Sequence, residues 1–274
     1  SFVMFALGNE LFGDQEVMDT LLACFRKVDS RHLYAFGANN FLGYSGQVQG
    51  EDFLVTCRIG GEWGGNPFNT HVRGSFSFAD ALDGGYINHT YPNSEMDFSD
   101  AIKFTTVPVI SHETAQFQVY PNYKEIAKYT GVLQPRNFEV FKKRLADAGM
   151  LDQAEDFFKA SGRWSSLLYR ADIEMDLRTA GFGGFQLLDL QDYPGQGSAY
   201  IGMLDAFMDS KGLISPEEWR EFCSAVVPLF VTEKFCWTNN ETLSGRVKIA
   251  NYSLDVLMGK RLFWKLTDEE DNSM

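Results

Sequence analysis

The chain opens with Ser1-Phe-Val-Met-Phe-Ala-Leu-Gly-Asn-Glu10, and a second stretch of the same design, Thr106-Val-Pro-Val-Ile-Ser-His-Glu113, follows later. Each stretch is an apolar run that ends on a glutamate. Unbroken apolar runs of this length are typical of strands buried on both faces, as in parallel sheets. A carboxylate at the end of such a strand is costly to desolvate unless it is paired or used. The two stretches therefore predict a parallel α/β fold and single out Glu10 and Glu113.

The rest of the pattern alternates strands with helices. Strands are expected over 2–7, 32–36, 52–59, 107–111 and 182–190, and helices over 14–29, 137–148, 152–161, 166–177 and 216–225. Asp14 and Ser215 are the expected N-caps of the first and last of these helices. Five strands separated by helical segments indicate parallel βαβ units. No GxGxxG motif follows the first strand, and polar residues gather where strands end, so a (β/α)8 barrel is favoured over a doubly wound sheet.

After Pro228 the pattern changes to short alternating runs. Residues 246–251 and 261–266 alternate as strands do, and the pairs Asn239-Asn240 and Gly259-Lys260 mark turns. We therefore expect residues 1–228 to be the C-terminal part of a barrel domain. Residues 229–274 are expected to begin a separate antiparallel β-sandwich domain that is cut short, and both ends read as cuts through a longer protein.

Composition excludes several classes of partner. The chain carries 37 acidic and 24 basic residues, a net charge of −13. Such a surface repels nucleic acid and anionic membranes, and no apolar run reaches the roughly 18 residues that span a bilayer. The four cysteines show no CxxC spacing, so neither a zinc site nor a disulfide framework is expected. The segment 60–97, rich in Gly, Asn and aromatic residues, is too long for a simple connection and is expected to carry function.

Three of the stretches together resemble a known family. The Gly8-Asn9-Glu10 strand, the Pro108-Val-Ile-Ser-His-Glu113 strand and Gly184-Phe-Gln-Leu-Leu-Asp-Leu-Gln-Asp192 are similar to barrel strands four, seven and eight of glycoside hydrolase family 2. This family contains β-galactosidases, β-glucuronidases and β-mannosidases. The resemblance covers residues 1 to about 225 and implies a partial (β/α)8 TIM barrel, strands four to eight, followed by the start of an all-β sandwich. The chain departs from the family where a Trp usually stands near the end of the eighth strand, since it has Leu188 and Asp189 there.

The resemblance also implies a division of roles. Glu10 would be the general acid/base, Glu113 the nucleophile, and Asn9 a contact to the sugar 2-hydroxyl. Retention of configuration needs two carboxyl groups roughly 5–5.5 Å apart, and it needs neither a metal nor an organic cofactor. Spacing alone leaves a structural ion pair or a metal site equally open for the two glutamates.

Further polar residues near strand ends are candidates for binding the sugar, and turn formation or capping is the alternative reading for each. His112 is not among them, because side chains alternate along a strand and His112 should point away from Glu113 unless the strand end bulges. The candidates are His89, Tyr91, Asn39, Gln191 and Asp192.

These expectations describe a retaining, exo-acting β-glycosidase with a carbohydrate substrate, β-galactosidase-like activity being one form of it. The alternatives are a non-catalytic carbohydrate-binding protein on a degenerate barrel and an inactive fragment of the enzyme. The resemblance implies a periplasmic or secreted protein, and the sequence makes no prediction of an oligomer.

Overall fold

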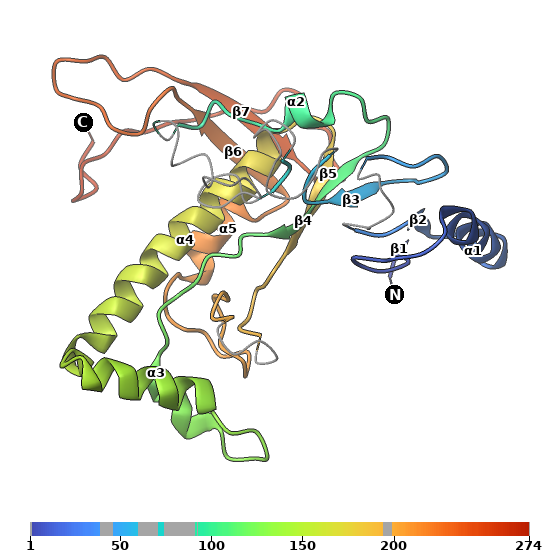
Figure 1. The fold of residues 1–274 in the computed structure, drawn as a ribbon. Helices are drawn as coiled ribbons and strands as arrows, with labels where there is room; N and C mark the ends of the chain where they lie inside the picture. Colours follow the sequence, from blue (N-terminus) through green and yellow to red (C-terminus); the bar gives the residue numbers. More distant parts are fainter. Residues whose placement is uncertain are drawn as a thin grey trace.

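A computed structural model describes residues 2–38, 46–59, 71–73, 91, 93–193 and 199–273. It shows a mixed fold of helices and strands (Figure 1). The elements are β1 (Met4–Ala6), α1 (Gln15–Val28), β2 (Leu33–Ala35), β3 (Leu54–Thr56), α2 (Ser99–Ile102), β4 (Val109–Thr114), the 3-10 helix η3 (Tyr123–Lys128), α3 (Arg136–Asp147), the 3-10 helix η4 (Leu151–Gln153), α4 (Ala154–Arg178), β5 (Phe182–Leu187), α5 (Pro216–Phe222), β6 (Val226–Val231) and β7 (Arg246–Asn251).

The first five strands run parallel, as the apolar runs predict. β1 pairs with β2, and β3, β4 and β5 pair in that order. Hydrogen bonds connect the β1–β2 pair to the segment just before β3. Asp52 N donates to Tyr34 O at 2.9 Å, and the buried Glu51 carboxylate accepts from Phe36 N at 3.0 Å. One apolar cluster also spans β2, β3 and β4: Ala35, Ala38, Phe53, Val55 and Ile110. The strands therefore follow one another in chain order, while closure into a barrel stays a prediction.

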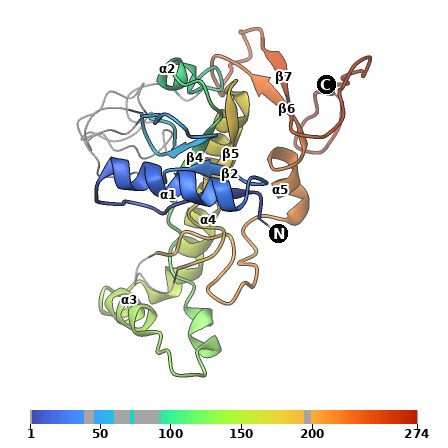
Figure 2. The ribbon, with the colours of Figure 1, turned by 90° about the vertical axis from the view of Figure 1, so that its right-hand side faces the viewer.

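The first strand is less buried than predicted. Phe2, Val3 and Met4 are exposed, although they were expected to be covered on both faces. α1 covers one side of β1 through Met18 and Leu22, and Figure 2 shows this helix lying along the outside of the strands. In the described ranges no strand pairs with the other edge of β1, which explains the exposure.

Helix ends agree with the capping signals. The Asp14 side chain accepts a hydrogen bond from Glu16 N at 2.8 Å, so the predicted N-cap of α1 is confirmed. Ser215 and Glu218 form a reciprocal capping box at α5, with Pro216 in the first turn. This arrangement satisfies backbone donors that a helix start leaves unpaired.

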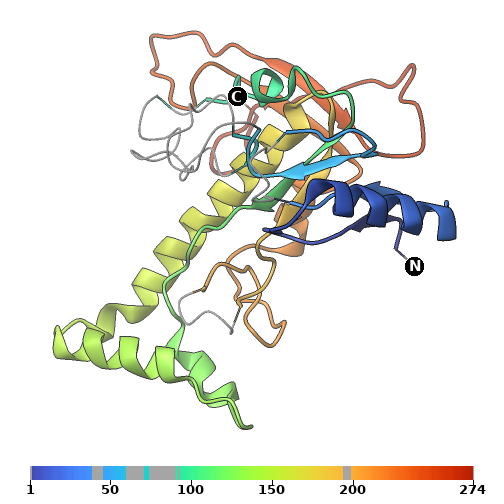
Figure 3. The same ribbon diagram turned by 45° about the vertical axis from the view of Figure 1, so that its right-hand side comes forward.

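The two helices predicted over 152–161 and 166–177 are in fact one. α4 has 25 residues and a length of about 37 Å. Gly162 lies where the break was expected, but a Cβ there would meet Leu213 Cδ2 at 2.3 Å. The glycine permits close packing on the helix instead of ending it. α4 carries α3 at the end remote from β6 and β7 (Figure 1 and Figure 3).

The C-terminal β segment was predicted only in part. β7 matches the expected strand, while its antiparallel partner β6 was missed and begins at Val226, before the expected domain boundary at residue 228. Val227 and Leu229 pack against Leu177 of α4, so the hairpin shares a core with that helix. The strand predicted over 261–266 does not form, since nothing in the described chain pairs with it.

The helices are too short or too polar to cross a membrane in the ranges that the structure describes.

Candidate functional site

The carboxyl end of β1 is held by the neighbouring strand. Glu10 N donates to Ala38 O at 2.8 Å, and Ala38 N donates to Gly8 O at 3.0 Å. Asn9 thereby pairs in parallel with Ala38, which extends the β1–β2 pairing as far as Glu10. The backbone that carries Asn9 and Glu10 is fixed although both residues are exposed.

The carboxyl end of β4 is irregular. β4 continues to Thr114, three residues past the predicted end, and its register against β5 shifts between Ser111 and Thr114. Glu113 has φ +54° and so does Glu10, a left-handed conformation uncommon for residues other than glycine. Such conformations persist only where the surrounding structure enforces them, and they cluster at functional sites. The two glutamates singled out by the sequence share this feature.

The irregular strand end changes where His112 lies. His112 does not point away from Glu113, because the strand end is irregular: the register shift interrupts the alternation of side chains, which is the exception that this prediction allows. Its Nε2 lies 3.1 Å from Asn9 Oδ1 and 3.7 Å from Glu113 Oε1, and its Nδ1 lies 2.6 Å from Gln186 Oε1. The imidazole therefore links the ends of β1, β4 and β5.

Glu113 is surrounded by donors. Arg73 Nη1 donates to both Glu113 O and Glu113 Oε2, each at 3.0 Å. Gln116 Nε2 donates to the same Oε2 at 3.3 Å, and Cys57 Sγ lies 3.9 Å from it. The Arg73 and Glu113 side chains are 7% and 19% exposed, so their pairing offsets much of the desolvation of both.

These contacts define the strand-end cluster. Two of the residues predicted from the sequence, Asn9 and Glu113, belong to it. Glu10 is next to Asn9 in the chain but is not a member. Sequence reasoning missed Cys57, Arg73, His112, Gln116 and Gln186. One signal was available, since Arg73 falls inside the segment 60–97 that was expected to carry function. The members of the strand-end cluster are Asn9, Cys57, Arg73, His112, Glu113, Gln116 and Gln186.

The Glu10 side chain is exposed and makes no hydrogen bond or ion pair with any described residue. It is thus an open carboxylate next to Asn9, whereas Glu113 is held from several sides. The expected 5–5.5 Å spacing of the two carboxyl groups stays a prediction.

The other predicted sugar contacts do not join this cluster. Asp192 is buried and paired with Lys211, whose Nζ lies 2.6 Å from Asp192 Oδ1, and it also accepts from Gly202 N at 3.0 Å. Burial raises the pKa of Asp192 despite the lysine. Tyr91 is 89% exposed, and Gln191 bridges in parallel to Leu204.

Two of the predicted contacts cannot be placed. Asn39 and His89 lie outside the described residues.

A second group of charges surrounds the Asp192–Lys211 pair. Glu125 is buried, its Oε2 has no hydrogen-bond partner, and burial raises the pKa of this carboxyl to about 7. Lys128 bonds to Asp205 and, at 2.8 Å, to Asp209. We call Glu125, Lys128, Asp192, Asp205 and Lys211 the arm cluster.

No group of three or more His, Cys, Asp and Glu side chains in the described ranges is arranged to hold a metal ion.

Comparison of the chain with protein-family models found no match, and comparison with curated proteins found none either. The family resemblance therefore stays a prediction, and the strand-end cluster has to be judged on its geometry and chemistry.

Proposed function

We propose that the strand-end cluster is the site of a retaining β-glycosidase, with Glu113 as nucleophile and Glu10 as general acid/base. The observation that carries this proposal is the contact between Asn9 Oδ1 and His112 Nε2 at 3.1 Å. It joins the residue before one glutamate to the residue before the other. Glu10 and Glu113 thus each follow a residue of this contact, at the carboxyl ends of parallel strands, where α/β folds place their ligands.

The reaction follows from two unlike carboxylates. In the first step Glu113 attacks the anomeric carbon, while Glu10 gives its proton to the leaving oxygen. In the second step Glu10 removes a proton from water, and the water oxygen displaces Glu113 from the glycosyl-enzyme. Two displacements at the same carbon retain the configuration.

The neighbouring residues suit these roles. Arg73 and Gln116 fix one oxygen of Glu113, Oε2, and leave the orientation of the carboxylate defined. Asn9 presents Oδ1 to His112, so its amide nitrogen is available to donate to a sugar hydroxyl. A hydrogen bond to the 2-hydroxyl that strengthens in the transition state supplies several kcal/mol.

The direct test is hydrolysis of a panel of 4-nitrophenyl β-glycosides, with galactoside, glucuronide, mannoside and glucoside as probes. We expect release of nitrophenol from at least one, with the β-sugar as first product by NMR. Glu113→Gln should lower kcat at least about 10,000-fold, because the nucleophile is lost. Glu139→Gln, an exposed change on α3, is the matched control and should leave kcat unchanged.

Product stereochemistry assigns the two roles. With azide present, Glu113→Gly should yield the α-glycosyl azide, because azide displaces the aglycone once from the vacated face. Glu10→Ala keeps the nucleophile, so azide attacks the glycosyl-enzyme and the β-azide results. The same anomer from both variants, or unchanged kcat in Glu113→Gln, would contradict the proposal.

One observation favours a second candidate, a carbohydrate-binding protein without activity. Glu113 Oε2 already accepts from Arg73 and Gln116, as a structural carboxylate would. Calorimetric binding of a sugar that the chain never cleaves would support this alternative.

A further inference from the structure

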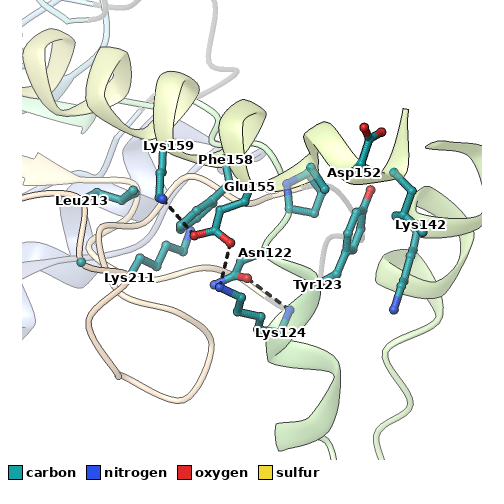
Figure 4. A pocket seen from close by; sticks show the side chains of 14 residues that line it. Asn122, Tyr123, Lys124, Lys142, Asp152, Glu155, Phe158, Lys159, Lys211 and Leu213 are labelled. Carbon is teal, nitrogen blue, oxygen red and sulfur yellow. Dashed lines mark hydrogen bonds and ion pairs between the residues drawn. The ribbon is translucent and has the colours of Figure 1, made fainter. Parts of the chain in front are cut away.

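A cavity of about 590 Å³ lies between η3, the first turns of α4 and the segment near Lys211 (Figure 4). It is separate from the strand-end cluster. Its lining includes four lysines, Lys124, Lys142, Lys159 and Lys211, together with Tyr123 and Glu155. This is a local concentration of positive charge on a chain whose net charge is −13.

Lys211 is paired with Asp192 at 2.6 Å, but the other three lysines are not fully neutralised by their neighbours. Lys124 Nζ and Lys159 Nζ lie 3.1 Å and 2.9 Å from the two oxygens of Glu155, so two ammonium groups share one carboxylate. Lys142 has no ion pair with a described residue. Asp152 also lines the cavity, but Figure 4 shows its carboxylate turned away from the ammonium groups of Lys124 and Lys159. An excess of positive charge therefore remains.

The start of α4 adds to the positive electrostatic potential of the cavity. Ala154, its first residue, lines the cavity, and the N-cap residue Gln153 makes no side-chain capping bond. The positive end of the helix dipole thus lies at the cavity wall, although Ala154 N itself donates to Leu151 O. Lysine ammonium groups and helix starts both favour oxyanions.

We propose that this cavity binds the carboxylate or sulfate group of an anionic saccharide. The saccharide part rests on the proposed function, whereas the anionic part rests on Lys124, Lys142 and Lys159 and on the start of α4. The volume suits a small ligand, and Tyr123 offers an aromatic wall for a sugar ring. The chain leaves β4 just after Glu113 and runs through residues 115–122 to η3. Pro121 and Asn122 of this segment line the cavity.

The oxyanion competes with Glu155 for Lys124 and Lys159. This predicts opposite effects from neighbouring substitutions, which a general change in net charge would not give. Lys159→Gln should weaken binding about tenfold, because it removes a charge-assisted hydrogen bond. Glu155→Gln should tighten binding severalfold, because it removes the competing carboxylate.

The test is calorimetric titration of the full chain with glucuronate and galactose 6-sulfate, with glucose, galactose and sodium sulfate as comparison probes. We expect both anionic sugars to bind more tightly than sulfate and the neutral sugars not to bind. Lys143→Gln is the matched control, because Lys143 pairs with Asp147 on α3 outside the cavity. It should bind like the unaltered chain, and circular dichroism checks that each variant is folded.

Different outcomes overturn different parts. No binding of any anion, or equal losses in Lys159→Gln and Lys143→Gln, would overturn the anion site. Anionic sugars that bind no better than sulfate would overturn the saccharide assignment. Neither result depends on hydrolysis at Glu113, so the proposed function stands or falls by its own test.

Discussion

The strand-end cluster and the arm cluster both contain a carboxylate paired with a cation, but the two pairs differ in how deeply they are buried. Each holds a carboxylate against a cation: Glu113 beside Arg73, and Asp192 beside Lys211. The Glu113 side chain keeps 19% of its surface exposed and sits on a left-handed backbone, while those of Asp192 and Lys211 keep 6% and 2%. The comparison teaches that a carboxylate near a strand end is not enough to mark a site. Burial separates an acid that stabilises the fold from one that a ligand can reach.

Breaking the Asp192–Lys211 ion pair of the arm cluster should have the largest effect on stability. Lys211→Met leaves Asp192 buried without its cation, and we expect the free energy of unfolding to fall by about 3–5 kcal/mol. Urea denaturation at pH 7 measures this. The control, Lys143→Met, breaks an exposed pair with Asp147 and should change stability by less than about 1 kcal/mol. Equal losses of stability in the two variants would show that the Asp192–Lys211 pair stabilises the fold no more than an exposed ion pair does.

The arm cluster should also give the fold a pH dependence. Burial raises the pKa of Glu125 from its ordinary value of 4.5 to about 7. The folded chain then keeps a proton that the unfolded chain releases, so this stabilisation is present below about pH 4.5 and is lost as the pH rises to about 7. Lys128, Asp192, Asp205 and Lys211 are the charged groups that act on it.

Glu125→Gln removes this titration. Between pH 5 and pH 8 the unaltered chain should lose about 2 to 3 kcal/mol of stability relative to the variant. Urea denaturation at the two pH values measures the difference, and Glu139→Gln on α3 serves as the exposed control. Parallel pH profiles for the Glu125 variant and the unaltered chain would contradict a buried, protonated Glu125.

The same contrast explains what sequence can reveal. The apolar runs predict all five parallel strands, and capping residues predict the starts of α1 and α5, because these signals are local. Asp192 and Glu113 look alike in sequence, since each follows an apolar strand. The two carboxylates differ in their surroundings, which depend on Lys211 and Arg73. These partners are 19 and 40 positions away in the chain, so no local sequence pattern predicts them.

Two other features differ from the sequence-based expectation because of contacts between residues distant in the chain. α4 stays continuous at Gly162 because Leu213, distant in the chain, packs there. His112 was expected to point away from Glu113 unless the strand end bulges, and the shifted register between β4 and β5 turns it toward Asn9. Tertiary contacts overrode a correct local rule in both places.

His112 offers the finest test of the strand-end cluster, and the smallest effect. It touches Asn9 and Gln186 and lies 3.7 Å from Glu113 Oε1, so we regard it as a positioning residue. His112→Ala should lower kcat on a cleaved aryl glycoside about 10- to 100-fold with little change in KM, because misplacement weakens contacts made in the transition state. His112→Gln keeps a donor and an acceptor near Asn9 and should restore part of the rate. A rise in KM alone, or no rescue by Gln together with lost stability, would make His112 a structural residue and leave the two glutamates without the link that joins them.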